Sequence, residues 1–157
     1  MINKIENWID ETLKDHLDKR VSCECFATAF NGFYPVAFLS RSYYVVVDEI
    51  PKPDFTELRQ AGLGDFMDMP VDGITYKDTY FILKGCEDNL ELHFHELVHV
   101  LQWETLGASN FISRYIEEVK QHGYEGSPLE KMAYALQYSF ANKVHPFSVP
   151  DYVNINI

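Results

Sequence analysis

The chain of 157 residues is long enough for one domain with a hydrophobic core and too short for two. Hydrophobic residues make up 46% of it and aromatic residues 15%, which excludes a disordered chain, and no apolar run approaches the roughly 18 residues of a membrane span. The formal net charge of −11 argues against nucleic acid or an anionic membrane surface as a partner. We therefore expect a single domain over residues 1–157.

The N-terminus and the cysteines both bear on the cellular compartment. Residues Met1–Trp8 contain no apolar segment of the kind found in a secretory signal. Three cysteines leave one unpaired in any disulfide scheme, which suits a reducing compartment. Cys23 and Cys25 lack the matching second pair of a thiolate metal site, so they are expected to be small buried thiols. These features predict a cytoplasmic protein.

The first half of the chain predicts a helix followed by strands. Apolar residues recur at helical spacing over residues 3–19, which indicates an amphipathic helix. Residues 33–39 and 43–50 are rich in β-branched and aromatic side chains and are expected to be strands, with residues 41–42 as a candidate turn between them.

A short helix, a loop and one long strand are expected next. Asp54 and Glu57 have the spacing of a capping box, which predicts a helix that ends near Ala61. Residues 62–73 contain several Gly, Asp and Pro residues and are expected to form a loop. Residues 74–83 form the clearest strand pattern. Four apolar residues are expected to share one face of that strand: Ile74, Tyr76, Tyr80 and Ile82.

The second half predicts helices. Asp88 begins a second capping box, and the helix that follows should end at Gly107. Ser109 is the expected cap of the next helix, and Ser127 with Pro128 has the pattern that opens the last one. An irregular tail should follow. A helix, then strands, then helices is the order of an α+β fold rather than of alternating βαβ units.

One motif, His95-Glu96-Leu97-Val98-His99, carries most of the functional information. Residues four apart on a helix are offset by about 40° and rise by about 6 Å, so both imidazoles face one point and can share a divalent ion. Glu96 lies about 100° round the helix from His95, which makes it a poor ligand and a suitable general base beside a metal-held water. The alternative interpretation is an amphipathic helix with two incidental histidines.

A catalytic zinc usually takes three protein ligands and keeps a fourth position for water, so a third ligand must lie elsewhere. Six carboxylates follow the motif: Glu104, Glu117, Glu118, Glu125, Glu130 and Asp151. Glu104 is about 180° round the same helix and is a poor candidate. Glu130, in the first turn of a second helix, is favoured, although its place in the Ser127 capping box would alone explain its identity. Glu117, Glu118 and Glu125 stay open as alternatives.

Several other side chains are candidates for supporting roles. Gln102 lies near the histidine face of its helix and could orient a ligand or line the cleft, or it could be a solvated polar residue. His93 is about 200° from the first ligand and is expected to be a core or surface histidine. Tyr115, His122 and Tyr124 could each stabilise an oxyanion, although core packing is the expected role for any single one of the ten tyrosines.

The pattern His95-Glu96-x-x-His99-x-x-Gln102, followed after about thirty residues by Pro128-x-Glu130 and Ala133, resembles gluzincin-type metallopeptidases. It looks closest to small bacterial zincin-like domains that share such a helix. The resemblance covers about residues 74–140 and implies a small mixed or antiparallel sheet packed on the active-site helix. It also implies that Glu130, on a second helix, is the third ligand and that residues 74–83 align an extended substrate. The metzincin extension is absent, and the resemblance does not extend to the first seventy residues.

The sequence therefore predicts a zinc-dependent metallopeptidase that acts on a peptide or protein substrate. One zinc ion held by His95, His99 and Glu130 would activate a water, and Glu96 would take its proton and pass it to the leaving amine. A zincin fold used for binding or structure without turnover is the first alternative. Hydrolysis of a non-peptide amide or ester is the second. The sequence predicts neither the substrate nor the oligomeric state.

Overall fold

The computed structural model describes residues 1–157 and shows an α+β fold with a small mixed sheet, as predicted. The sheet has the strand order β1-β2-β4-β3, in which β2 and β4 are parallel and the other two pairs are antiparallel. The strands are β1 (Val21–Ser22), β2 (Tyr43–Val47), β3 (Gly73–Tyr76) and β4 (Thr79–Leu83). The helices are α1 (Ile2–Asp15), α2 (Val36–Ser40), α3 (Thr56–Leu58), α4 (Gly64–Asp68), α5 (Leu90–Leu106), α6 (Ala108–His122), α7 (Pro128–Ala141) and α8 (Val149–Asn156).

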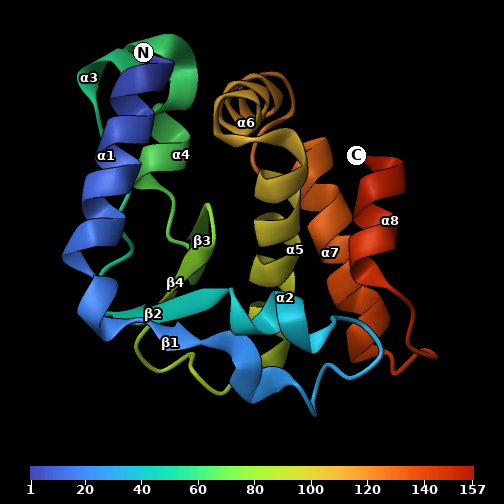
Figure 1. Cartoon of the computed structure of the whole chain (residues 1–157). Coiled ribbons are helices and arrows are strands. Elements are labelled where there is room, and N and C mark those ends of the chain that lie inside the picture. Colours follow the sequence, from blue (N-terminus) through green and yellow to red (C-terminus); the bar gives the residue numbers. More distant parts are fainter.

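Helix α5 runs through the middle of the molecule (Figure 1). The strands β3 and β4 lie on one side of it, α7 and α8 lie on the other, and α6 crosses one end. Helices α1 and α4 stand beyond β3, at the far left of the view. Because α5 has neighbours on all sides, every residue of α5 from His93 to Trp103 is buried.

The stretch predicted as one strand over residues 74–83 is a hairpin, so this part of the prediction is wrong. The chain turns after Tyr76 through Lys77, whose φ of 60° lies in the left-handed region. Tyr76 then pairs with Thr79, and the turn places Tyr76 and Tyr80 on opposite faces of the sheet. The four residues expected on one face are therefore divided between two faces.

Each face of the hairpin packs into its own hydrophobic core. Tyr80 and Ile82 belong to a core that also contains Phe94 from the first half of α5. Phe81 on the opposite face belongs to a second core with Trp103 from the end of α5. Helix α5 therefore joins the two cores, and the second one includes residues of α1.

The ends of α5 show which capping predictions hold. The side chain of Asn89, not Asp88, caps the N-terminus by accepting a hydrogen bond from the Leu92 amide at 3.2 Å. The helix ends at Gly107 as predicted, with a φ of 79° that favours glycine. Helix α6 begins directly after Gly107, so Ser109 lies inside it and caps nothing.

The last two helices begin with similar caps. Ser127 caps α7 by accepting a hydrogen bond from the Glu130 amide at 3.4 Å, and Pro128 occupies its first turn, as predicted. The tail, predicted to be irregular, instead forms α8, because Ser148 caps it in the same way and Pro150 is tolerated in its first turn.

Two further expectations for the first half are wrong. Residues 33–39 do not form a strand: α2 starts after Pro35, and its side chains Phe38 and Leu39 are buried in the first core. There is accordingly no hairpin between this segment and β2, which pairs in parallel with β4 instead. Apolar runs of this length are ambiguous between a buried strand and a buried helical turn.

The segment from Pro53 to Met69 forms short helical turns where one helix and a loop were predicted. Asp54 does not cap α3; its carboxylate accepts hydrogen bonds of 2.6 and 2.8 Å from the Arg59 guanidinium, which also pairs with Asp68 at 2.7 Å. These ion pairs connect the two ends of the segment, and its turn at residues 59–63 packs against α6.

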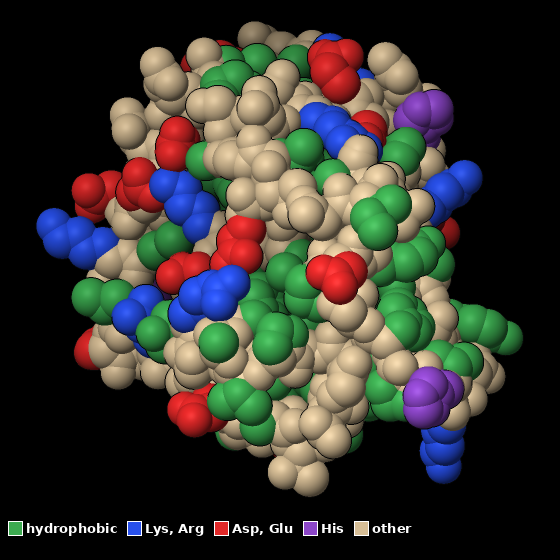
Figure 2. All heavy atoms as spheres, turned by 45° about the vertical axis from the view of Figure 1, so that its right-hand side comes forward, with side chains coloured by type: hydrophobic (Ala, Val, Ile, Leu, Met, Phe, Trp, Pro, Cys, Tyr) green, Lys and Arg blue, Asp and Glu red, His purple; other side chains and the backbone are tan.

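Six of the 13 basic side chains form ion pairs with acidic ones: Lys4, Arg41, Arg59, Lys77, Arg114 and Lys120. On the face in Figure 2, lysine and arginine side chains lie singly or beside aspartate and glutamate side chains. This pattern agrees with the net charge of −11, and the expectation that nucleic acid is not a partner stays a prediction. No helix of the fold has both the length and the apolar character that crossing a lipid bilayer needs.

Candidate metal centre

Three buried side chains from two helices converge on one point. His95 and His99 lie on one face of α5, and Glu130 projects from the first turn of α7. The Oε1 atom of Glu130 is 3.0 Å from Nε2 of His95 and 3.1 Å from Nε2 of His99, and the two Nε2 atoms are 3.2 Å apart. These three side chains form a group that can bind a metal ion.

The geometry of the cluster fits a tetrahedral ion. Two donors at roughly 2.1 Å from such an ion lie roughly 3.4 Å apart, and the three separations of 3.0, 3.1 and 3.2 Å are somewhat shorter. Two imidazole nitrogens and one carboxylate oxygen are a donor set that zinc binds in catalytic sites. The residues present therefore fit a metal ion, and small outward shifts of the side chains would admit it.

Two glutamines fix the tautomers of the histidines. The Nδ1–H of His95 donates to Oε1 of Gln137 at 2.9 Å, and the Nδ1–H of His99 donates to Oε1 of Gln102 at 2.7 Å. The amide group of Gln102 donates to the Leu129 carbonyl at 3.1 Å, which requires that its oxygen face His99. With Nδ1 of each ring donating to a glutamine, Nε2 is the nitrogen that would bind a metal.

Glu96 lies beside the cluster and is held from β3. Its Oε1 accepts a hydrogen bond from the Thr75 hydroxyl at 2.9 Å, and its Oε2 lies 3.8 Å from Nε2 of His95. Gly73 makes room for it, since a Cβ at that position would lie 3.2 Å from the Glu96 carboxyl carbon. The carboxylate is thus placed next to the metal position without being one of the three converging ligands.

The electrostatics of the cluster favour positive charge at its centre. Burial opposes the charged form of His99, but the Glu130 carboxylate outweighs burial and raises the pKa of His99 to about 9. Burial alone would raise the pKa of Glu130, yet His99 and His95 hold that pKa well below its ordinary value. Burial raises the pKa of Glu96, although the two histidines act against it. Glu130 is therefore an anion that faces two imidazoles, as a cation site requires.

Three tyrosines surround the open side of the cluster. The Tyr115 hydroxyl donates to Oε2 of Glu130 at 2.7 Å, which orients that carboxylate. The Tyr134 ring packs on His95 at 4.4 Å between centroids, and its hydroxyl donates a long 3.5 Å hydrogen bond to the oxygen of Tyr124. Burial and the Glu130 charge raise the pKa of Tyr124, so its hydroxyl stays a neutral donor.

The structure does not bring the other candidate residues to this site. His122 is exposed at the end of α6, so the prediction of an oxyanion role for it is not supported by its position. Glu104 pairs with Arg41 at the surface, and Glu117 and Glu125 are exposed. Glu118 is buried, but it accepts hydrogen bonds from Arg114 at 2.7 Å and from the Leu129 amide at 2.8 Å.

His93 faces the opposite side of α5 and is a core histidine. Its Nε2 donates to the Glu87 carbonyl at 2.8 Å, so its Nδ1 must accept the 2.7 Å hydrogen bond from the Tyr80 hydroxyl. The Cys23 thiol donates in turn to the Tyr80 oxygen at 3.4 Å. This chain of hydrogen bonds satisfies three buried polar groups and is separate from the metal centre.

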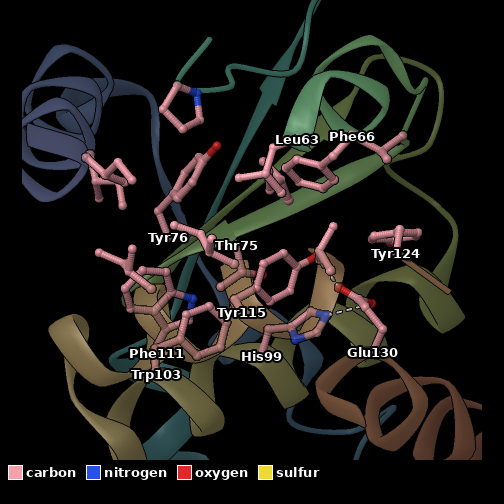
Figure 3. Close-up of a pocket in the computed structure, with 18 of the residues that line it drawn as sticks. Leu63, Phe66, Thr75, Tyr76, His99, Trp103, Phe111, Tyr115, Tyr124 and Glu130 are labelled. Atoms are coloured by element: carbon pink, nitrogen blue, oxygen red, sulfur yellow. Dashed lines mark hydrogen bonds and ion pairs between the residues drawn. The ribbon is translucent and has the colours of Figure 1, made fainter. Parts of the chain in front are cut away.

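A pocket of about 90 Å³ opens directly beside the cluster (Figure 3). His99, Glu96 and Glu130 form its polar end, and Tyr115 and Tyr124 flank them. The remaining walls are mostly apolar. They come from α1, the segment before β3, β3 itself, α5 and α6, and include Ile9, Leu63, Phe66, Ile74, Trp103 and Phe111.

Sequence reasoning missed two residues that form hydrogen bonds to the centre. Gln137 follows Glu130 by seven residues, which is two helical turns, so both lie on one face of α7 and their spacing was a usable signal. Thr75 gave no signal, because its role depends on how β3 packs against α5. Gln102, which could have been a solvated residue, is fully buried and binds His99.

No family model matches the chain, and no curated protein and no solved structure matches it. What is established is an α+β fold in which a buried group of two histidines and one glutamate can bind a metal ion.

Proposed function

We propose that the chain is a zinc-dependent metallopeptidase. The observation that carries this proposal is the convergence of His95, His99 and Glu130, in which a glutamine binds Nδ1 of each histidine and both Nε2 atoms face the same carboxylate oxygen. Histidines that are buried only for packing would not need to place both Nε2 atoms next to the same carboxylate oxygen. The donor set of two histidines and one glutamate is one that zinc hydrolases use.

The number of ligands favours a catalytic site over a structural one. A structural zinc normally has four protein ligands, whereas a catalytic zinc has three and keeps one position open. Three side chains converge on one point. The hydrogen bond from Thr75 holds the Glu96 carboxylate beside that point, so Glu96 is not a fourth member of the group. The open side of the cluster also faces the pocket. A purely structural metal would need neither an open coordination position nor an adjacent pocket.

Bound zinc would supply Lewis-acid chemistry, in that it polarises a scissile carbonyl and lowers the pKa of water. The chain itself supplies the proton transfers. Oε2 of Glu96 has no hydrogen-bond donor within the chain, so it can accept the proton of the attacking water and later release it to the leaving amine. The neutral Tyr124 hydroxyl, which lines the pocket, would donate to the developing oxyanion.

The edge strand β3 offers a place for an extended peptide. The Leu83 amide donates to the Asp72 carbonyl at 2.9 Å, so this pair is hydrogen-bonded within the hairpin. Bonded and non-bonded pairs alternate in an antiparallel ladder, which directs the backbone groups of Gly73 and Thr75 toward the open edge. Because Thr75 on β3 binds the Glu96 carboxylate, a substrate strand paired with β3 would run close to Glu96.

The test of this proposal combines metal content with a cleavage assay. The purified chain is reconstituted with zinc, its metal content is measured, and it is incubated with denatured proteins and small amide and ester substrates. We expect one zinc per chain and peptide fragments that disappear when the zinc is chelated. Bound zinc without any cleavage would favour a binding or structural role, and cleavage of only the small substrates would favour a non-peptide hydrolase. A chain that binds no zinc would overturn the proposal.

Thr75→Val is expected to lower kcat about tenfold while zinc content stays unchanged. The substitution keeps the side-chain shape and removes the 2.9 Å hydrogen bond to Glu96, and hydrogen bonds to charged groups contribute about 1.5–3 kcal/mol. Peptide hydrolysis at saturating substrate measures the effect. Thr79→Val in β4 is the matched control, because its hydroxyl bonds Asp78 and not the site. Equal losses in both variants would show that the hairpin, not Glu96, is perturbed.

A further inference from the structure

The candidate metal centre is shielded from solvent. The side chains of His95, His99, Glu96 and Glu130 are each only 3–5% exposed. The pocket beside them measures about 90 Å³. A cavity of about 150 Å³ holds one benzene molecule, so this pocket has no room for the backbone and side chains of a peptide. A substrate can therefore reach the centre only when part of the surrounding wall moves.

The segment of residues 52–70 is the part of the wall with the fewest bonds to the rest of the chain. No strand pairing includes it, and the loop hydrogen bonds of its backbone stay within it. Its one ion pair to another element joins Glu57 to Lys4 of α1 at 3.1 Å, and both side chains are more than half exposed. Apolar contacts therefore supply most of its attachment. Segments with few such bonds are those that open locally while the rest of a fold stays closed.

The same segment is well connected internally. The guanidinium of Arg59 pairs with Asp54 at 2.6 Å near the start of the segment and with Asp68 at 2.7 Å near its end. The Lys52 ammonium donates to the Phe66 carbonyl at 2.9 Å and so connects the two ends a second time. A compact surface loop whose ends lie close together is an Ω-loop, and such loops are frequently functional. These bonds hold the segment together as one body.

Apolar side chains of the segment cover the pocket. Leu63 is 3% exposed and lines it. Phe66 lies at the metal end, where its ring centroid is 6.0 Å from that of Tyr115 and 6.1 Å from that of Tyr124. Figure 3 shows Leu63 and Phe66 projecting from the segment into the pocket, on the side opposite to His99. An outward movement of the segment would therefore uncover the pocket and the metal centre behind it.

The other walls of the pocket are attached more firmly. Strand β3 is paired with β4, and α1 is held to this hairpin by ion pairs of Lys77 with Glu6 at 2.9 Å and with Asp10 at 2.7 Å. Helix α6 packs on α5 through the stacked rings of Phe111 and Trp103, whose centroids are 4.1 Å apart. Among the walls, the segment of residues 52–70 is therefore the one that can move at the smallest cost.

We infer that residues 52–70 form a lid, which opens as one body to admit an extended peptide to the metal centre and then closes over it. In the closed position Phe66 completes the wall beside the two tyrosines that flank the centre. The choice of a peptide as the ligand rests on the proposed function. The opening itself requires neither zinc nor turnover, and it can be measured in the zinc-free chain.

The experiment measures how fast a thiol inside the pocket reacts with iodoacetamide under native conditions. Ile112 on α6 is 4% exposed and lines the pocket, so Ile112→Cys places a reporter thiol there. Cys25 and Cys86 are replaced by serine, and Cys23, buried in the first core, stays as an internal control. Peptide mapping separates the two labelled sites. We expect the thiol at position 112 to react about tenfold faster than Cys23 or more, because only Cys23 requires the whole fold to open.

Two further variants of this reporter chain show which wall moves. Leu63→Ala removes a lid contact with the pocket and should speed labelling at position 112 about 10- to 100-fold. Glu118→Ala is the matched control, because it removes the 2.8 Å hydrogen bond that ties α6 to α7 and leaves the lid contacts in place. It should speed the labelling of Cys23 and leave the rate at position 112 unchanged.

Two results would overturn the lid. One is a thiol at position 112 that reacts no faster than Cys23, and the other is Glu118→Ala speeding that thiol as much as Leu63→Ala does, since α6 or the whole fold would then be what opens. A lid that opens in a chain that cleaves no peptide would uphold this inference and contradict the peptidase proposal alone. Peptide cleavage by a chain whose pocket opens only on unfolding would contradict the lid alone.

Discussion

Glu96→Gln is expected to lower the rate of peptide hydrolysis by about 10²- to 10⁴-fold, the range that a general base contributes. Glutamine keeps the shape of the side chain and can still receive the Thr75 hydrogen bond, but it cannot accept the proton of the attacking water. Because Glu96 lies outside the group of three converging ligands, the variant should bind zinc as the wild type does. The expected pattern is therefore lost turnover with retained metal.

The measurement is kcat on a peptide substrate together with zinc content and the thermal unfolding midpoint. Glu104→Gln is the matched control, since Glu104 lies on the same helix and contacts only Arg41 at the surface. A Glu96→Gln chain that cleaves peptides as fast as the wild type would show that this carboxylate is not the base.

Zinc is expected to stabilise the wild-type chain strongly and the Glu130→Gln chain weakly. A ligand that binds only the folded state stabilises it by about 4 kcal/mol when its free concentration is a thousand times its Kd. For a domain of this size that corresponds to a rise in Tm of roughly 8–16 °C. Glutamine at position 130 removes the anion that faces both imidazoles, so most of this rise should be lost.

Thermal unfolding with and without added zinc measures this difference. Glu117→Gln is the control: Glu117 was an alternative third ligand in the sequence, and the structure places it on the exposed face of α6. That control should keep the full response to zinc. If Glu130→Gln gains as much stability from zinc as the wild type, Glu130 is not a ligand.

The part of the site that could be predicted from sequence lies within one helix. The spacing of His95, Glu96 and His99 fixes their relative directions wherever α5 packs. Glu130 could only be favoured, because its distance to the histidines depends on the packing of α7 against α5. The capping role of Glu130 in α7 is compatible with its place in the cluster. Its backbone amide donates to the Ser127 cap, and its carboxylate faces the histidines.

The errors in the fold have a common physical origin in short apolar segments. The chain turns at Lys77, where no glycine or asparagine indicates a turn in the sequence. The two short strands on either side therefore had the sequence pattern of a single long strand. Residues 33–39 form a short apolar run in which residues 35–37 are exposed and the residues on either side are buried, and a run of that length does not separate strand from helix by its pattern. The first seventy residues, which carried no motif, supply a wall of the pocket through side chains such as Ile9, Leu63 and Phe66.

The burial of α5 on all sides has a consequence for how the protein folds. A surface helix is oriented about its own axis by its apolar stripe, but α5 is surrounded by apolar neighbours and has no such stripe to orient it. Its rotation must then be set by polar groups, namely His93 on one side and His95 and His99 on the other. A turn of about 100°, one residue, would leave all three imidazoles unpaired in the core. The residues proposed for catalysis thus also determine which of several equally apolar packings the chain adopts.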